Sequence, residues 1–136
     1  MIDKEIIKIA SNTENNGVLD NHTHSSKLKN AICGDEMKVY LIIEDNKILN
    51  FKYESESCIY CQASVSLLSK NAKNKSIDKV KKFAEQAIKI FEKNVQSFDK
   101  EWKEFNKIIK KNNISRKECL LLPLNTTLDA LKNKPL

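Results

Sequence analysis

The sequence predicts an α+β fold in which a small antiparallel three-stranded sheet packs against four to five helices. Residues 22–56 contain stretches in which apolar and polar side chains alternate, the period of a half-buried strand. From residue 58 onward the apolar residues recur at the spacing of one helix face. The 136 residues include no Pro- or Gly-rich linker and no internal repeat. We therefore expect residues 1–136 to form one domain with one core.

The first elements of the chain are a short helix and an edge strand. Residues 3–11 place Ile6, Ile7 and Ile9 on a helix that ends in the Asn-rich turn before Gly17. Residues 22–27 are expected to form the first strand, at the edge of the sheet.

A hairpin is expected to follow. Its first strand buries the alternating residues Met37, Val39, Leu41 and Ile43. Asp45-Asn46 provides a tight turn, because both residue types tolerate a positive φ. The returning strand is expected to bury Leu49, Phe51 and Tyr53.

Helices fill the second half of the chain. One is expected to begin at Cys58, and Ser76 is expected to cap the next. Asp99 is expected to cap a third, and a last helix follows Cys119. The residues expected to face the core from the later helices are Ile77, Val80, Ala84, Ala87, Ile88, Phe91, Trp102, Phe105, Ile108, Ile109, Leu124, Leu128 and Leu131. Pro123 has no N–H to donate, so we expect it in the first turn, with Cys119 at or beside the N-cap.

The net charge of +6 does not indicate nucleic-acid binding. Arg116 is the one arginine, whereas phosphate and base recognition usually draws on arginine. The lysines alternate with acidic residues and asparagines, as on solvated helix faces. No apolar run is long enough to span a membrane, and residues 1–5 lack a signal-peptide pattern. We expect a cytoplasmic protein with reduced thiols, no membrane contact and no nucleic-acid partner.

Three cysteines and one aspartate stand at junctions between the expected elements. Cys33 and Asp35 precede the hairpin, Cys58 stands where a strand gives way to a helix, and Cys119 heads the last helix. Three thiolates and a carboxylate are a ligand set for tetrahedral Zn²⁺ or an iron–sulfur centre. Each cysteine taken alone is better explained as a small core residue. The alternative for Asp35, a turn residue at the entry to a strand, is the weaker explanation. Their joint placement favours a metal site.

The expected positions also have chemical consequences. Cys58 and Cys119 lie at helix N-termini, where the helix dipole favours the thiolate. Gly34 allows the chain to bend, so that Cys33 and Asp35 can converge on one ion. A carboxylate is the harder and weaker ligand on zinc, so Asp35 is the ligand expected to dissociate first.

Two other arrangements of side chains have the spacing of a site. Cys58 and Cys61 have the spacing of a redox dithiol, but no βαβ pattern surrounds them, and we expect Cys61 to stay outside the ligand set. His22 and His24 would point to one side of a strand and could bind a metal. We expect them to be surface residues of the edge strand.

Four segments together resemble the SufU/IscU/NifU-type iron–sulfur cluster assembly proteins. Residues 12–17 (Asn-Thr-Glu-Asn-Asn-Gly) are similar to the family's Asn-Pro-Arg-Asn-x-Gly segment, and Cys33-Gly34-Asp35 follows in order. Residues 58–66 resemble the family's second-cysteine motif, and residues 116–123 its third-cysteine segment. Thr13, Glu14, Ser57 and Cys61 depart from the family pattern. Glu118 before the third cysteine and the long helical insert resemble the SufU-type branch.

The resemblance implies a SufE/NifU-like fold and a function in cluster assembly. It implies that Cys33, Asp35, Cys58 and Cys119 bind Zn²⁺, iron or a [2Fe–2S] cluster, with Cys33 as the first sulfur acceptor. The implied partners are a pyridoxal-phosphate-dependent, SufS-like cysteine desulfurase and, downstream, apo iron–sulfur proteins or the SUF scaffold complex. Two alternatives remain open: a zinc-dependent sulfurtransferase that activates the desulfurase without carrying a cluster, and a binding module in which zinc only holds the fold together.

Overall fold

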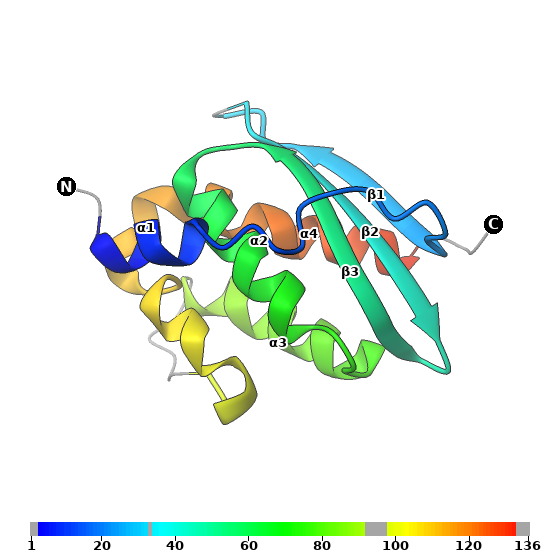
Figure 1. The fold of residues 1–136 in the computed structure, drawn as a ribbon. Coiled ribbons are helices and arrows are strands. Elements are labelled where there is room, and N and C mark those ends of the chain that lie inside the picture. The colour runs from blue at the N-terminus through cyan, green and yellow to red at the C-terminus, as the bar shows by residue number, and fades with distance from the viewer. Residues whose placement is uncertain (1–2, 33, 92–97, 133–136) are drawn as a thin grey trace.

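The computed structural model describes residues 3–32, 34–91 and 98–132. Within these ranges, three strands and a set of helices form an α+β fold, as the sequence predicts (Figure 1). The elements in chain order are α1 (Lys4–Ala10), β1 (His24–Lys29), β2 (Glu36–Glu44), β3 (Lys47–Glu56), α2 (Ile59–Asn71), α3 (Ile77–Ile90), the 3-10 segments η1 (Lys100–Lys107) and η2 (Lys111–Arg116), and α4 (Lys117–Lys132).

The sheet is antiparallel with the strand order β1-β2-β3, so the expected edge strand is confirmed. It begins two residues later than expected, at His24. Asp45 and Asn46 join β2 to β3 with φ values of 52° and 62°. Positive φ at both central residues matches the right-handed twist of the strands, which explains the tight hairpin.

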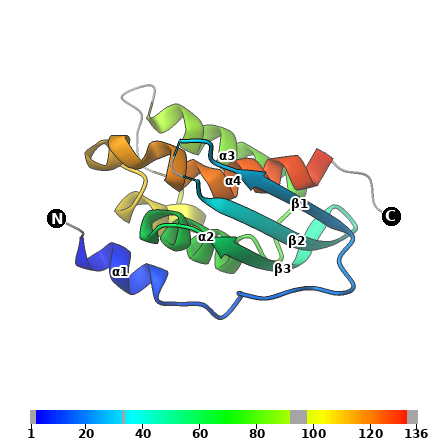
Figure 2. The ribbon, with the colours of Figure 1, turned by 90° about the horizontal axis from the view of Figure 1, so that it is seen from above.

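Helices cover one face of the sheet (Figure 2). Both α2 and α4 pack on the strands, and α3 packs against α4. Inward-facing strand residues fill the core between these layers, among them Met37, Val39 and Phe51, each 0% exposed. None of the helices in the described ranges is both long and apolar enough to cross a membrane.

Residues 12–17, the Asn-rich segment after α1, contact both β3 and α2. Asn15 is buried, its Nδ2 donates to Ser69 Oγ at 3.1 Å, and its Oδ1 accepts from Lys73 Nζ at 2.5 Å. Its backbone carbonyl accepts from Tyr53 N at 3.1 Å. These contacts give residues 12–17 a structural role, because a buried amide costs free energy unless it is hydrogen-bonded.

The prediction that Leu49 faces the core is wrong. The register between β2 and β3 shifts beside Ile42 and Ile43, where Ile43 pairs with Ile48 and Ile42 with Asn50. Leu49 is therefore the extra residue of a β-bulge and is 42% exposed, whereas Ile48 is fully buried. A bulge reverses the alternation of faces along a strand, which a uniform period of two does not include.

The helix expected after Asp99 is a 3-10 segment, η1, and the Asp99 side chain makes no capping hydrogen bond. The residues predicted to face inward are nevertheless buried: Trp102, Phe105, Ile108 and Ile109. Phe83 stacks on Trp102 with ring centroids 4.1 Å apart. In α3 the Ser76 cap is confirmed, since its side chain accepts from Lys79 N. The expected stripe omitted Phe83 and Ile90, both buried.

The predicted start of the last helix is also wrong. Pro123 lies inside α4, not in its first turn, and Cys119 is the third helical residue. The reason is that η2 runs directly into α4, so the helix begins at Lys117. Pro123 is accommodated in the second turn at the cost of one helical hydrogen bond.

Candidate metal centre

The structure brings three of the four expected ligands together. One ligand atom each from Asp35, Cys58 and Cys119 lies within 4.8 Å of the other two. The three residues come from the entry to β2, the start of α2 and the first turn of α4. The site therefore forms where the start of β2 meets the N-termini of the helices α2 and α4.

Asp35 is positioned by a short loop between β1 and β2. Asn30 N donates to the carbonyl of Asp35 and Gly34 N donates to the carbonyl of Asn30, both at 2.7 Å. Gly34 has a φ of +75°, a conformation that costs a residue with a Cβ roughly 1–2 kcal/mol. The bend expected at Gly34 is therefore present and directs the Asp35 side chain toward the helices.

Cys58 is the N-cap of α2. Its backbone is extended, with φ −72° and ψ 169°, and its side chain makes no capping hydrogen bond. Its backbone N–H instead donates to Asp35 Oδ1 at 3.2 Å. This contact connects two of the candidate ligands directly.

Cys119 lies in the first turn of α4, and a buried hydrogen bond holds this part of the helix against α2. Because Pro123 has no N–H, the helical hydrogen bond from residue 123 to the carbonyl of Cys119 cannot form. One residue on, the carbonyl of Leu120 accepts from Ser64 Oγ of α2 at 2.7 Å, and Ser64 is 0% exposed. This buried contact fixes the first turns of α4 against α2.

The residues fit a metal ion. Asp35 is 6% and Cys119 4% exposed, while Cys58 is half-buried. Asp35 Oδ2 is buried without a hydrogen-bond partner in the described structure, which costs several kcal/mol for an ionised oxygen unless a cation or donor compensates it. Ligand atoms around tetrahedral Zn²⁺ lie roughly 3.5–3.8 Å apart, so small side-chain movements close the group.

The remaining expected residues are placed as follows. Cys33, the predicted sulfur acceptor and fourth ligand, lies outside the described residues. Cys61 is fully buried in α2 and is not a member of the three-residue group. His22 and His24 hydrogen-bond locally through Nδ1, to the carbonyl of Leu19 and to Thr23 Oγ1.

The sequence patterns did not predict the role of two residues that support the site, Asn30 and Ser64. Asn30 accepts from Ile32 N through Oδ1 at 3.0 Å, and its buried Nδ2 has no hydrogen-bond partner among the described atoms. Ser64 bridges to α4 as described above. An asparagine three residues before Cys33, at the end of a strand, is a signal that could have identified Asn30 as a loop-closing residue.

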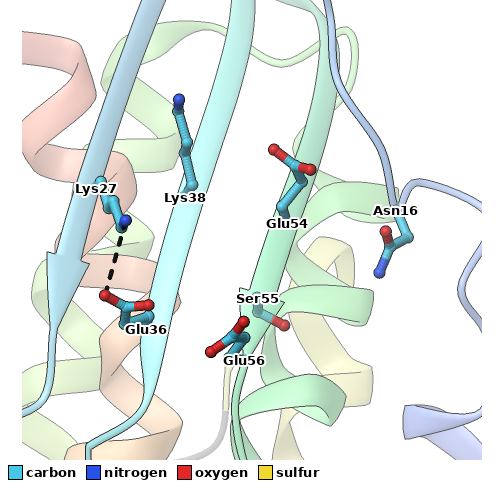
Figure 3. Close-up of a pocket in the computed structure, with 7 residues that line it drawn as sticks. All are labelled: Asn16, Lys27, Glu36, Lys38, Glu54, Ser55 and Glu56. Atoms are coloured by element: carbon cyan, nitrogen blue, oxygen red, sulfur yellow. Dashed lines mark ion pairs between the residues drawn. The ribbon is translucent and has the colours of Figure 1, made fainter.

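A separate groove of about 380 Å³ lies on the outer face of the sheet. Figure 3 shows Lys27, Lys38, Glu36, Glu54 and Glu56 projecting from the three strands into it, beside Asn16 and Ser55. Lys27 Nζ lies 3.7 Å from Glu36 Oε1 in an exposed ion pair. The groove has mixed charge, and none of the three grouped ligands lines it.

Residues 1–104 match the model of the NifU-like N-terminal domain. The chain belongs to this family. The family expectation from the sequence is thus confirmed, together with the α+β fold.

One relative and two solved structures match this NifU-like chain over nearly its whole length. It is 31% identical over 132 residues to the iron–sulfur cluster assembly scaffold protein IscU of Thermotoga maritima, covering 97% of this chain and 93% of the relative. A second similar protein is FiSufU from Fervidobacterium islandicum AW-1, described as an iron–sulfur cluster assembly scaffold protein for the SUF system. Its crystal structure superimposes with a TM-score of 0.80 at 26% identity, and the match covers 96% of both chains. A NifU-like N-terminal protein from Brucella abortus gives a TM-score of 0.88 at 20% identity, covering 96% and 91%.

Proposed function

We propose that this protein acts in iron–sulfur cluster assembly by accepting persulfide sulfur from a cysteine desulfurase. It builds or relays a cluster on Cys33, Asp35, Cys58 and Cys119. The observation that carries the proposal is the convergence of Asp35, Cys58 and Cys119, with ligand atoms within 4.8 Å, in a chain of the NifU-like family. The scaffold function named for the Thermotoga relative supports it.

The ligand residues have different roles in this proposal. Cys58 and Cys119 supply thiolates, which bind Zn²⁺ and iron strongly. Asp35 supplies a carboxylate oxygen, the harder and weaker ligand, and Oδ2 is the oxygen left for that role because Oδ1 already accepts from Cys58 N. Cys33, two residues before Asp35 in the sequence, completes the set. The bound species is Zn²⁺ or iron as a [2Fe–2S] cluster.

Sulfur delivery requires that the desulfurase can reach the acceptor cysteine. A persulfide passes from thiolate to thiolate, so the desulfurase cysteine has to reach bonding distance of an acceptor. Ala31, Ile32 and Gly34 beside Cys33 are exposed, and Ile32 is 82% exposed. We therefore assign the first sulfur to Cys33. A SufS-like desulfurase upstream, and apo iron–sulfur proteins or the SUF complex downstream, are the proposed partners in a reducing cytoplasm.

Anaerobic reconstitution tests the proposal. The reduced protein is incubated with iron, L-cysteine and a SufS-like desulfurase, and cluster formation is followed by visible absorption. The proposal predicts a cluster that transfers to an apo-ferredoxin. Colourless protein that keeps zinc and still stimulates the desulfurase would establish the zinc-dependent sulfurtransferase instead. Zinc that neither exchanges nor affects the desulfurase would leave only a structural role.

A further inference from the structure

Cys58 and Cys61 occupy the N-cap and the third position of α2. From helix geometry, residues three apart have Cα atoms about 5 Å from each other. That separation lies inside the range of about 4.4–6.8 Å that a disulfide requires. An N-cap side chain also has a rotamer that reaches toward the third helical residue, as capping residues show. A disulfide between the two cysteines therefore needs a side-chain rotation and no unwinding of α2.

The two thiols differ in access. Cys58 is half-buried, whereas Cys61 is 0% exposed and packs in the core. Among the described cysteines, Cys58 is thus the one that an incoming sulfur carrier reaches first. A reachable thiol at the helix N-terminus with a buried thiol three residues later is the arrangement of a dithiol in which the second residue resolves an intermediate on the first.

The Cys58 side chain has two possible partners, a metal ion in the ligand group and the thiol of Cys61. It contributes one atom to the group with Asp35 and Cys119, and it makes no capping hydrogen bond that would hold it at the end of α2. A disulfide to Cys61 withdraws it from the ligand group. The Cys58 sulfur therefore cannot bind a metal and form a disulfide to Cys61 at the same time.

We propose that Cys61 reduces a persulfide carried on Cys58 and so releases sulfide for cluster building. This step rests on the proposed function, because it describes what happens to sulfur once it has reached the site, directly or through Cys33. The Cys61 thiolate attacks Cys58 Sγ and forms the Cys58–Cys61 disulfide. The persulfide S–S bond breaks, and the outer sulfur leaves as hydrosulfide with its proton. The outer sulfur gains two electrons, and the two cysteine sulfurs supply them. A small thiol or a dithiol protein then reduces the disulfide for the next turnover.

The test uses the apo, fully reduced chain and inorganic polysulfide as the sulfur donor, so that no desulfurase or metal is needed. After excess polysulfide is removed anaerobically, sulfide release is followed without added thiol, and cysteine pairing is mapped by peptide mass spectrometry. We expect the wild-type protein to release sulfide at least about tenfold faster than Cys61→Ala, and to accumulate the Cys58–Cys61 disulfide. Cys61→Ala keeps its persulfide. Gln62→Ala is the control, because it changes an exposed residue beside Cys61 in the same helix and outside the ligand group, and it releases sulfide at the wild-type rate.

Two results overturn the proposal. One is wild-type protein that carries persulfide but releases no sulfide until a thiol is added. The other is release that persists in Cys61→Ala and disappears in Cys119→Ala. Zinc binding by Cys61→Ala, measured in parallel, shows that this variant is folded. Because the assay contains no desulfurase, its failure leaves the cluster-assembly function standing, and failure of reconstitution leaves the dithiol result standing.

Discussion

The backbone N–H of Cys58 donates a hydrogen bond to Oδ1 of Asp35 over 3.2 Å, across 23 residues of sequence. The bond joins the N-terminus of α2 to the loop before β2, and it leaves Oδ2 of Asp35 as the oxygen without a partner among the described residues. Two of the candidate ligands, Asp35 and Cys58, are thus connected to each other before any ion binds.

Asp35 is predicted to control exchange rather than retention of the bound metal or cluster. Asp35→Ala is expected to slow transfer to an acceptor at least about tenfold while the metal stays bound, because the weakest ligand is also the one that leaves. Asp35→Asn is the matched variant, since its amide oxygen still accepts from Cys58 N. Transfer rates are measured with a chromophoric chelator or an apo-ferredoxin. Wild-type transfer in Asp35→Ala would make Asp35 a turn residue only.

Gly34 is predicted to matter for its backbone alone. A Cβ added there meets no atom within 4 Å, but φ is +75°. Gly34→Val is expected to lower the free energy of unfolding by about 1–2 kcal/mol and to weaken zinc binding, whereas Gly34→Asn costs less because asparagine tolerates this region. Denaturant titration and zinc competition check both variants. Equal effects of valine and asparagine would show that space, not φ, limits the position.

The loop and the turns show what the sequence predicted well. The bend at Gly34 and the hairpin at Asp45-Asn46 follow from residue types that tolerate positive φ, which is local information. The reversal at Leu49 was not predictable from local alternation, because the bulge depends on how β3 pairs with β2.

The same limit applies to the site. Local rules placed Cys58 at a helix start, and the structure has it as the N-cap of α2. They put Pro123 in a first turn because they could not include η2, which extends α4 backward. Convergence of Asp35 with Cys58 and Cys119 depends on packing between distant elements. Their shared placement at junctions between elements indicated it, and the family resemblance supported it.

Ser64 is predicted to stabilise the contact between α2 and α4. Ser64→Ala leaves the buried Leu120 carbonyl without the hydroxyl that donates to it at 2.7 Å. We expect the free energy of unfolding to fall by about 1–3 kcal/mol. Ser57→Ala, at a partly exposed position near the same site, should change it by less than about 0.5 kcal/mol. Urea unfolding compares the two, and equal small effects would mean that the Ser64 hydroxyl contributes nothing.

The surface around the site, with α1 as a second contact, is predicted to dock the desulfurase, rather than the lysine-rich faces. Ile6 is fully buried, so trimming α1 would damage the core, but Ile7 is 48% exposed and can be changed alone. Ile7→Ser and Ile32→Ser are expected to reduce desulfurase stimulation, since exposed apolar side chains contribute to such contacts. Lysine-to-glutamine changes at residues 79–82 and 107–111 should alter it less than about twofold. Loss of stimulation in the lysine variants alone would indicate electrostatic docking on the helical insert.

Metal content of the purified protein and its cysteine variants tests the ligand assignment most directly. One metal ion or cluster site per chain is expected in the wild type and in Cys61→Ala, because Cys61 is not in the ligand group. Cys33→Ala, Cys58→Ala and Cys119→Ala should each lose most of the metal, since each removes a thiolate. Circular dichroism confirms that the variants are folded. If Cys61→Ala loses the metal while Cys119→Ala retains it, the site described here is not the metal site.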